Sequence, residues 1–190
     1  TEVNEGSFMF TVAVVAGRAA LVRDGRVFDL ATLSGDDTLR DIDTAIARSD
    51  ELHALDTASA NAIGDVGEVA FELPTPRPRQ VFAVGLNYHD HAAESQMETP
   101  PAPLIFTKYP SCLTGPVDPV RLSSEFVDYE GELVVVIGKE CTQVSRDNAW
   151  SVVAGLAVGQ DISDRVVQFT GAPPQFTMGK SFVTFGPVGP

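Results

Sequence analysis

The sequence predicts an α+β fold that is rich in strands and poor in helices. Most apolar runs are short and end at Gly or Pro, and the strongest, ELVVVIG at 132–138, is β-branched as strands prefer. The pair Asp24-Gly25 separates two apolar runs, which is typical of a tight hairpin. Helical spacing is confined to short segments, so regular βαβ alternation is not expected.

The first 73 residues predict a small N-terminal domain that contains β-strands. After the hairpin, apolar residues recur at roughly helical spacing, which predicts one or two short helices between 37 and 55. These residues are Leu39, Ile42, Ile46 and Leu52. Residues 74–80 carry three prolines and predict a linker, so residues 81–190 form the second, larger domain.

Composition narrows the classes of function. With 44% hydrophobic residues, the 190-residue chain can bury a sizeable core. A formal net charge of -13 disfavours nucleic acid and anionic membranes as partners, and no apolar run approaches the roughly 20 residues of a membrane helix. The cysteines, Cys112 and Cys141, form no CxxC pair, which is typical of reduced thiols and predicts a cytoplasmic protein.

Three carboxylates are candidate metal ligands. Glu130 and Glu132 stand two apart at the start of the strongest strand, so they project from the same face. Asp161 follows another apolar run, where a strand would end. Three such oxygen donors suit Mg²⁺ or Mn²⁺. The plainer alternatives are two solvent-facing charges at a strand end and an aspartate that caps a turn.

A histidine and a glutamate offer general-base chemistry. His91 and Glu94 are three residues apart and would share one face of a helical turn. Glu94 would then orient the imidazole of His91 toward water. His89 competes for either role, and an ordinary surface His–Glu pair is the alternative reading.

An acidic chain that takes an anionic substrate needs local cations. Arg165 and Gln168 follow Asp161 by four and seven residues, and Lys180 lies in MGKSF, so these residues are candidates to contact an anion. No GxSxG or GxGxxG motif is present, so the serine-hydrolase and dinucleotide-binding classes lack support.

Five stretches, in order over residues 81–190, together resemble the fumarylacetoacetate hydrolase family. They are VGLNYHDHAAE, PLIFTKYPSCLTGP, DYEGELVVVIGK, VVAGLAVGQDISDRVVQ and MGKSFVTFGPVGP. The resemblance implies a mixed β-sandwich roll, preceded by the small N-terminal domain. It also implies several strands beyond Pro190, so we expect the catalytic domain to be incomplete at its C-terminal end.

The resemblance implies a role for each candidate. Glu130, Glu132 and Asp161 match the metal-binding acids of the family. The remaining matches are the water-activating pair His91 and Glu94, the catalytic lysine Lys180 beside the metal, and the substrate contacts Arg165, Gln168 and Tyr88. Two positions depart from the common pattern: Gln160 replaces an Asn, and Ser163-Asp164-Arg165 replaces Ser-Ala-Arg.

The implied activity is hydrolysis of a carbon–carbon bond in a small anionic 2-oxo-acid or β-diketone acid, through an enolate stabilised by Mg²⁺, with Mn²⁺ or Ca²⁺ as alternatives. The alternatives within the family are an isomerase of the 2-hydroxyhepta-2,4-diene-1,7-dioate type, from aromatic catabolism, and an oxaloacetate decarboxylase. The resemblance also implies a homodimer. A non-catalytic metal-binding fragment is the alternative from another class.

Overall fold

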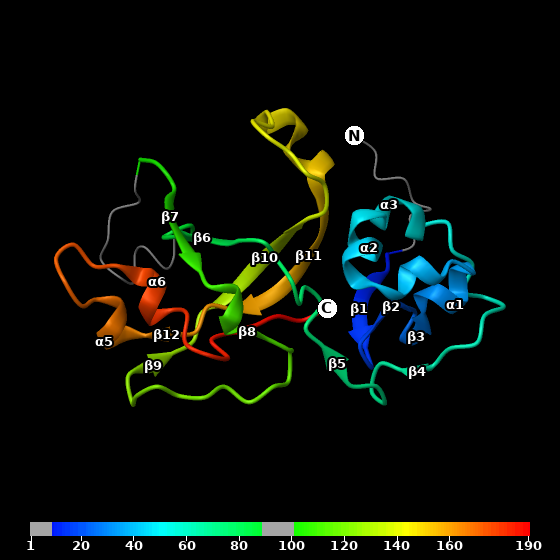
Figure 1. Cartoon of the computed structure of the whole chain (residues 1–190), viewed down its shortest axis with the longest axis horizontal. Helices are drawn as coiled ribbons and strands as arrows, with labels where there is room; N and C mark the ends of the chain where they lie inside the picture. Colours follow the sequence, from blue (N-terminus) through cyan, green and yellow to red (C-terminus); the bar gives the residue numbers. More distant parts are fainter. Residues whose placement is uncertain (1–8, 89–100) are drawn as a thin grey trace.

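The computed structural model describes residues 9–88 and 101–190. Two parts lie next to each other in Figure 1: a sheet with short helices built from residues 9–72, and a second part built mainly of strands from residue 81 onward. The predicted α+β class with many strands is confirmed.

The N-terminal part is built on an antiparallel five-stranded sheet with strand order β4-β3-β2-β1-β5. Its strands are β1 (Thr11–Val15), β2 (Arg18–Arg23), β3 (Arg26–Asp29), β4 (Gly64–Asp65) and β5 (Phe71–Glu72). Arg23 pairs with Arg26, so Asp24 and Gly25 are the two turn residues, with φ of 52° and 76°. Positive φ at both positions is the type I′ geometry, so the predicted hairpin is confirmed.

Short helices pack on this sheet, and the prediction of helix between 37 and 55 is confirmed, with more helices than the one or two expected. They are α1 (Leu30–Ser34), the 3₁₀ helix η1 (Asp37–Arg40), α2 (Ile42–Ala47) and α3 (Ser49–Leu52). Asp29 and Asp41 each accept a backbone hydrogen bond at 2.9 Å at a helix start, and such a cap contributes about 1 kcal/mol. The helices and strands share one apolar core. It is made of Val14, Ala19, Leu21, Phe28, Leu30, Leu39, Ile42, Ala45 and Leu52.

Residues 73–80 carry no helix or strand, and the elements on either side belong to different sheets. The division into domains 1–73 and 81–190 with a linker at 74–80 stays a prediction. Among the described residues, one ion pair joins the two parts, from Lys139 Nζ to Asp50 Oδ2 at 2.8 Å, with both side chains exposed. An exposed pair of this kind stabilises by at most about 1 kcal/mol.

In the second part, residues 81–88 and 101–190 form four two-stranded sheets and short helices. The strand pairs are β6 (Val81–Gly85) with β7 (Leu104–Lys108), β8 (Leu113–Thr114) with β13 (Gly186–Pro187), β9 (Val127–Asp128) with β12 (Ser163–Asp164), and β10 (Gly131–Ile137) with β11 (Val153–Gln160). The helices are the 3₁₀ helices η2 (Pro110–Cys112) and η3 (Arg146–Val152), and the α-helices α5 (Arg165–Gln168) and α6 (Phe176–Gly179). Neither α5 nor α6 was predicted from the sequence.

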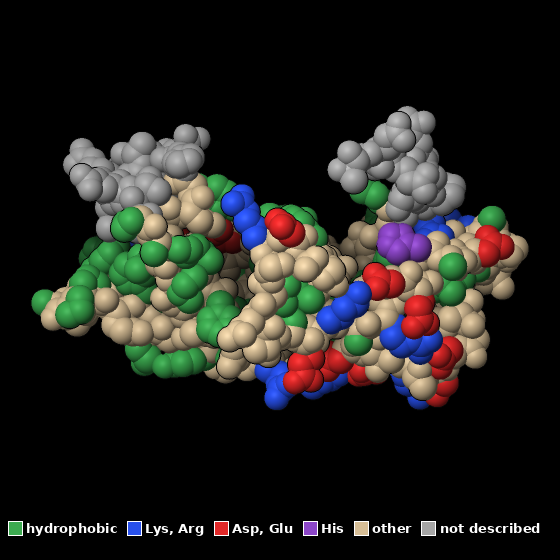
Figure 2. Space-filling model, turned by 90° about the horizontal axis from the view of Figure 1, so that it is seen from above, with side chains coloured by type: hydrophobic (Ala, Val, Ile, Leu, Met, Phe, Trp, Pro, Cys, Tyr) green, Lys and Arg blue, Asp and Glu red, His purple; other side chains and the backbone are tan. Residues whose placement is uncertain are grey.

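The β10–β11 pair positions the candidate site. Its antiparallel register places Leu133 opposite Val158 and Glu132 opposite Gly159. Side chains alternate between faces along a strand, so Leu133 and Val158 share one face and Glu132 lies on the other. The face that carries Leu133 and Val158 is exposed and apolar. In Figure 2, exposed hydrophobic side chains gather on the left, over the second part of the chain.

Candidate metal centre

The β10–β11 register brings two of the predicted acids together. Glu130 directly precedes β10, and Asp161 directly follows β11. The backbone N–H of Asp161 donates to the carbonyl oxygen of Glu130 at 2.9 Å. The position of Asp161 at a strand end is therefore as predicted, and its main chain is fixed next to that of Glu130.

Lys180, which follows α6, lies between the two carboxylates. Its Nζ donates to Glu130 Oε2 at 2.9 Å, to Asp161 Oδ2 at 2.8 Å and to Ser163 Oγ at 2.7 Å. Its side chain is only 3% exposed. Three oxygen atoms from separate residues thus converge on one cationic atom, away from solvent.

A second buried lysine, Lys108 at the end of β7, was not singled out from the sequence. Its Nζ donates to Asp161 Oδ1 at 2.6 Å, to the carbonyl oxygen of Phe185 at 3.0 Å and to the carbonyl oxygen of Lys180. The sequence signal that could have indicated Lys108 is its position at the end of a largely apolar strand. Because carbonyl groups hold Lys108 as well, it stays fixed independently of Glu130.

Arg165 and Gln168, on α5, also reach the acid pair. Arg165 Nη1 donates to Glu130 Oε1 at 2.5 Å and to Gln168 Oε1 at 3.0 Å. The other edge of the guanidinium binds Asp128, from Nη2 to Oδ2 at 2.8 Å and from Nε at 3.2 Å. The structure therefore places both predicted substrate contacts at this site, where Arg165 holds Glu130 in place and Gln168 is buried beside it.

Neighbouring cations lower the pKa of two carboxyl groups at the site, those of Glu130 and Asp128. Burial acts to raise the pKa of Glu130, but Lys180 and then Arg165 outweigh it and leave that pKa below its ordinary value. The hydrogen bond from Arg165 likewise lowers the pKa of Asp128. Ionised carboxylate oxygens at neutral pH are the form that binds a cation.

The donor set fits a hard divalent cation. The carboxylates of Glu130 and Asp161 share the ammonium group of Lys180, while Arg165 binds the first and Lys108 the second. Carboxylate oxygens suit Mg²⁺ and Mn²⁺. Glu132 lies on the same face of β10 by strand alternation. Within residues 9–88 and 101–190, however, no three His, Cys, Asp or Glu side chains form a metal-site group. Ligation by Glu132 stays a prediction.

The remaining candidates from the sequence are His91, Glu94 and Tyr88. His91 and Glu94 lie outside the described residues, and so does the competing His89. Tyr88 is exposed and follows β6. Ser163 was missed by sequence reasoning: it is fully buried, accepts from Lys180 and donates to the carbonyl oxygen of Asp161 at 2.9 Å.

Comparison with known proteins identifies the family. Residues 80–190 match the model of the fumarylacetoacetate (FAA) hydrolase C-terminal domain. The chain belongs to the fumarylacetoacetate hydrolase family. This match takes in Glu130, Glu132, Asp161 and Lys180, so the acid pair and its lysine lie in the part that defines the family.

Two curated relatives are similar over the same part. A Dictyostelium discoideum protein, the "Fumarylacetoacetate hydrolase domain-containing protein 2 homolog", is 44% identical over 115 residues, which are 60% of this chain and 38% of that protein. The human "Oxaloacetate tautomerase FAHD2A, mitochondrial" is 43% identical over 125 residues, which are 65% of this chain and 40% of that protein. The chain thus spans about two-fifths of the length of these relatives.

A solved relative shows the same fold over nearly the whole chain. It is the maleylpyruvate hydrolase of Sphingobium sp. SYK-6, in complex with manganese(II) ion and pyruvate. The TM-score is 0.73 at 28% identity, and the match covers 95% of this chain and 65% of that one. The predicted family fold is confirmed.

In the described part of the chain, no helix has both the length and the apolar character that crossing a membrane requires. The human relative carries the word mitochondrial in its name. The cytoplasmic location therefore stays a prediction.

Proposed function

We propose that this chain carries the metal centre of a hydrolase that cleaves a carbon–carbon bond in a small 2-oxo-acid or β-diketone acid. One observation carries the proposal: the carboxylates of Glu130 and Asp161 converge on a single buried cationic atom, Lys180 Nζ, at 2.9 Å and 2.8 Å. Membership of the fumarylacetoacetate hydrolase family supports it.

Glu130 and Asp161 would hold Mg²⁺, or Mn²⁺ or Ca²⁺ in its place, with Glu132 as the proposed third ligand. When bound, the cation supplies Lewis-acid stabilisation of the enolate that forms as the bond breaks. The ammonium group of Lys180 would then give up its contacts with the two carboxylates. A lysine has a long flexible stem, so Lys180 can turn this charge toward a developing oxyanion of the substrate.

The substrate class follows from the charges around the site. The chain as a whole is strongly acidic, yet Lys108, Arg165 and Lys180 gather at the acid pair. Local cations of this kind attract an anionic substrate. The related maleylpyruvate hydrolase was crystallised with pyruvate, a 2-oxo-acid, which supports the same class here.

Water activation is assigned, as a proposal, to His91 with Glu94 behind it. The imidazole would take a proton from water as that water attacks the distal carbonyl carbon. Arg165 and Gln168 would orient the carboxylate end of the substrate, and Tyr88 would contact it from the end of β6. In the structure Arg165 binds Asp128, Glu130 and Gln168, so it would reach a substrate carboxylate by turning Nη1 away from Glu130 or Gln168.

A second candidate reaction is proton transfer without bond cleavage. The human relative, 43% identical, is named an oxaloacetate tautomerase. Keto–enol exchange of a 2-oxo-acid uses the same enolate, so the acid pair and Lys180 serve both reactions. The isomerase and decarboxylase alternatives share this enolate as well.

A product assay on the full chain separates these reactions. Acylpyruvates and oxaloacetate are supplied with Mg²⁺ or Mn²⁺, and the released pyruvate, carbon dioxide and enol content are followed. The proposal expects pyruvate from an acylpyruvate, with loss of activity in Glu130→Gln and Asp161→Asn, and unchanged activity in the exposed control Asp50→Asn. Metal-dependent loss of enol alone would select the tautomerase.

No turnover by a folded chain that binds the metal would favour the non-catalytic metal-binding fragment instead. The partner assignments also stay proposals: a small anionic 2-oxo-acid substrate, a homodimer, and no binding of nucleic acid or membranes. Sedimentation of the purified chain tests the homodimer directly.

A further inference from the structure

Asp164, the last residue of β12, is a buried carboxylate that takes no part in the acid pair. It is 2% exposed, and no lysine or arginine contacts it among the residues the structure describes. The resemblance drawn from the sequence leads one to expect Ala at this position. A buried charge is costly unless it is fully hydrogen-bonded, so its partners determine what it does.

Each oxygen atom of Asp164 serves a different segment. Oδ1 accepts from the backbone N–H groups of Val166 and Val167, at 3.2 Å and 3.1 Å, and so caps the start of α5. Oδ2 accepts from the hydroxyl groups of Ser123 and Ser124, at 2.6 Å and 2.8 Å. One side chain therefore joins the loop before β9 to the helix after β12.

The loop before β9 and helix α5, which Asp164 joins, together determine the position of Arg165. Arg165 is the first residue of α5, and its backbone N–H donates to the carbonyl oxygen of Phe126 at 3.0 Å. Asp128, which binds the guanidinium edge of Arg165, follows Phe126 by two residues on the other joined segment. A shift of the loop relative to α5 would separate Arg165 from Asp128, and so change where the guanidinium points.

We infer that Asp164 is a positioning residue of this chain: by holding the loop at 123–126 against α5, it fixes Arg165 for the carboxylate of the substrate. The inference rests on the proposed function, since it takes Arg165 to be a substrate contact. Asp164 does not touch the acid pair, and it reaches Glu130 only through Arg165, so we expect a larger effect on binding of the organic anion than on binding of the metal.

The test separates those two binding events. Calorimetry measures the Kd of Mn²⁺ for the full chain, and then the Kd of oxalate, a mimic of the pyruvate enolate, for the Mn²⁺-loaded chain. Asp164→Ala is expected to leave the Mn²⁺ Kd within about twofold and to weaken oxalate about fivefold, the effect of one lost cap or hydrogen-bonded tie. Asp164→Asn retains an oxygen for the cap, but it turns an amide N–H₂ group, which cannot accept a hydrogen bond, toward the two serines, and is expected to fall between.

Two further variants distinguish positioning from plain stability. Ser123→Ala combined with Ser124→Ala removes only the loop contacts and is expected to weaken oxalate about threefold. Asp41→Ala removes a comparable helix cap of the N-terminal part, far along the chain from the site, and is expected to lower the Tm without changing the oxalate Kd.

Each outcome is decisive. Unchanged oxalate affinity in Asp164→Ala would overturn the positioning role. A parallel fall of Tm, Mn²⁺ affinity and oxalate affinity would also overturn it, because that is the result of general destabilisation. A wild-type chain that binds no Mn²⁺ would overturn the proposed function, and this inference with it. If the wild type binds both Mn²⁺ and oxalate, the variants test the role of Asp164 alone.

Discussion

Replacing Lys180 by Met should destabilise the metal-free chain and make its stability depend strongly on Mn²⁺. The Lys180 side chain is 3% exposed and bonds to the carboxylates of Glu130 and Asp161, which are 17% and 10% exposed. Methionine keeps much of the volume but removes the positive charge. Two ionised carboxylates then face each other without the cation that lies between them.

The loss of stability in Lys180→Met depends on the ion pairs that the two carboxylates keep. Removing one partner of a buried ion pair costs about 3–5 kcal/mol. Lys108 still binds Asp161 Oδ1 and Arg165 still binds Glu130 Oε1, so we expect about 3 kcal/mol, at the lower end. For a chain of this size that corresponds to a fall in Tm of roughly 6–12 °C.

Mn²⁺ should reverse this loss. Binding at 100 times the Kd stabilises the folded state by about 2.7 kcal/mol, close to the expected deficit. The Lys180→Met chain should also bind Mn²⁺ more tightly than the wild type, because the metal no longer competes with the ammonium group.

Thermal unfolding followed by circular dichroism, in EDTA and in Mn²⁺, measures both effects. Lys139→Met is the matched control, since Lys139 forms an exposed ion pair with Asp50. It should change the free energy of unfolding by less than about 1 kcal/mol, with or without metal. A Lys180→Met chain as stable as the wild type in EDTA would refute the reasoning, because it would mean that the two carboxylates do not need the cation between them.

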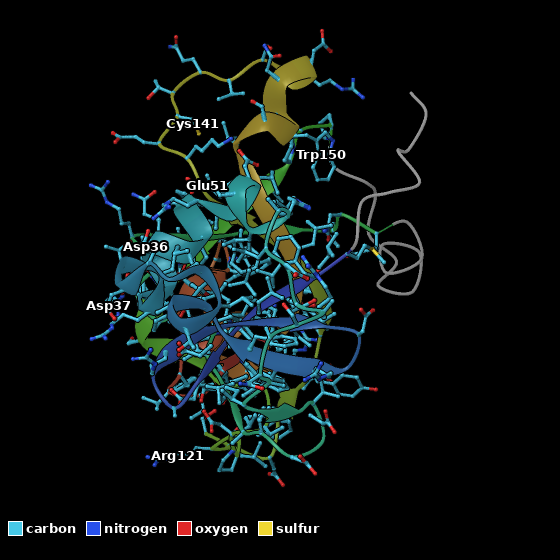
Figure 3. The ribbon with its side chains drawn as sticks, turned by 90° about the vertical axis from the view of Figure 1, so that its right-hand side faces the viewer. Asp36, Asp37, Glu51, Arg121, Cys141 and Trp150 are labelled. Carbon is cyan, nitrogen blue, oxygen red and sulfur yellow. The ribbon has the colours of Figure 1, made fainter. Side chains whose placement is uncertain are left out.

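Two further predictions concern the titration of Glu130 and the reactivity of the two cysteine thiols. Because the folded-state pKa of Glu130 lies below its ordinary value, its stabilising contribution is present above the unfolded pKa of about 4.3 and is lost as pH falls through the folded pKa. Glu130→Gln should therefore lose less stability between neutral pH and pH of about 3 than the wild type does, as thermal unfolding across pH would show, and equal losses would contradict the ion pairs. Burial raises the pKa of Cys112, whereas Cys141 is exposed in the segment that precedes η3 (Figure 3). A thiol reagent should label only Cys141 in the native chain, so Cys141→Ser should abolish native labelling, and rapid labelling of Cys112 would show that its surroundings open.

Local features of the fold were readable from the sequence because short-range chemistry determines them. The turn at Asp24-Gly25 needs positive φ at both positions, and the β10 segment is a β-branched run with a fixed period. The helices α5 and α6 were missed, because each is a single turn of four residues and such a turn has no hydrophobic period to detect.

The candidate site was predictable in part for a similar reason. Glu130 and Asp161 flank apolar strands, so their positions at strand ends followed from the pattern, whereas their contact depends on the β10–β11 register. Lys108 and Ser163 act through contacts with residues far from them in sequence, such as that between Lys108 and Asp161, which are 53 positions apart. Sequence spacing carries no signal for contacts of this kind.

Charged and apolar side chains occupy different regions of the surface, and composition alone did not indicate this. Charged side chains gather over the N-terminal helices, where Asp36, Asp37 and Glu51 project outward in Figure 3. Apolar side chains remain exposed along β10 and β11. Net charge averages over both regions, so it predicts neither the apolar face nor the cluster of cations at the acid pair.

The most direct test of the central claim is calorimetric binding of Mn²⁺ and Mg²⁺ to the wild-type chain, with and without oxalate. The convergence of Glu130 and Asp161 predicts saturable binding of one metal ion, strengthened by oxalate and lost in Glu130→Gln and Asp161→Asn. A folded chain that binds neither metal, or that binds equally well without these two carboxylates, would contradict the account.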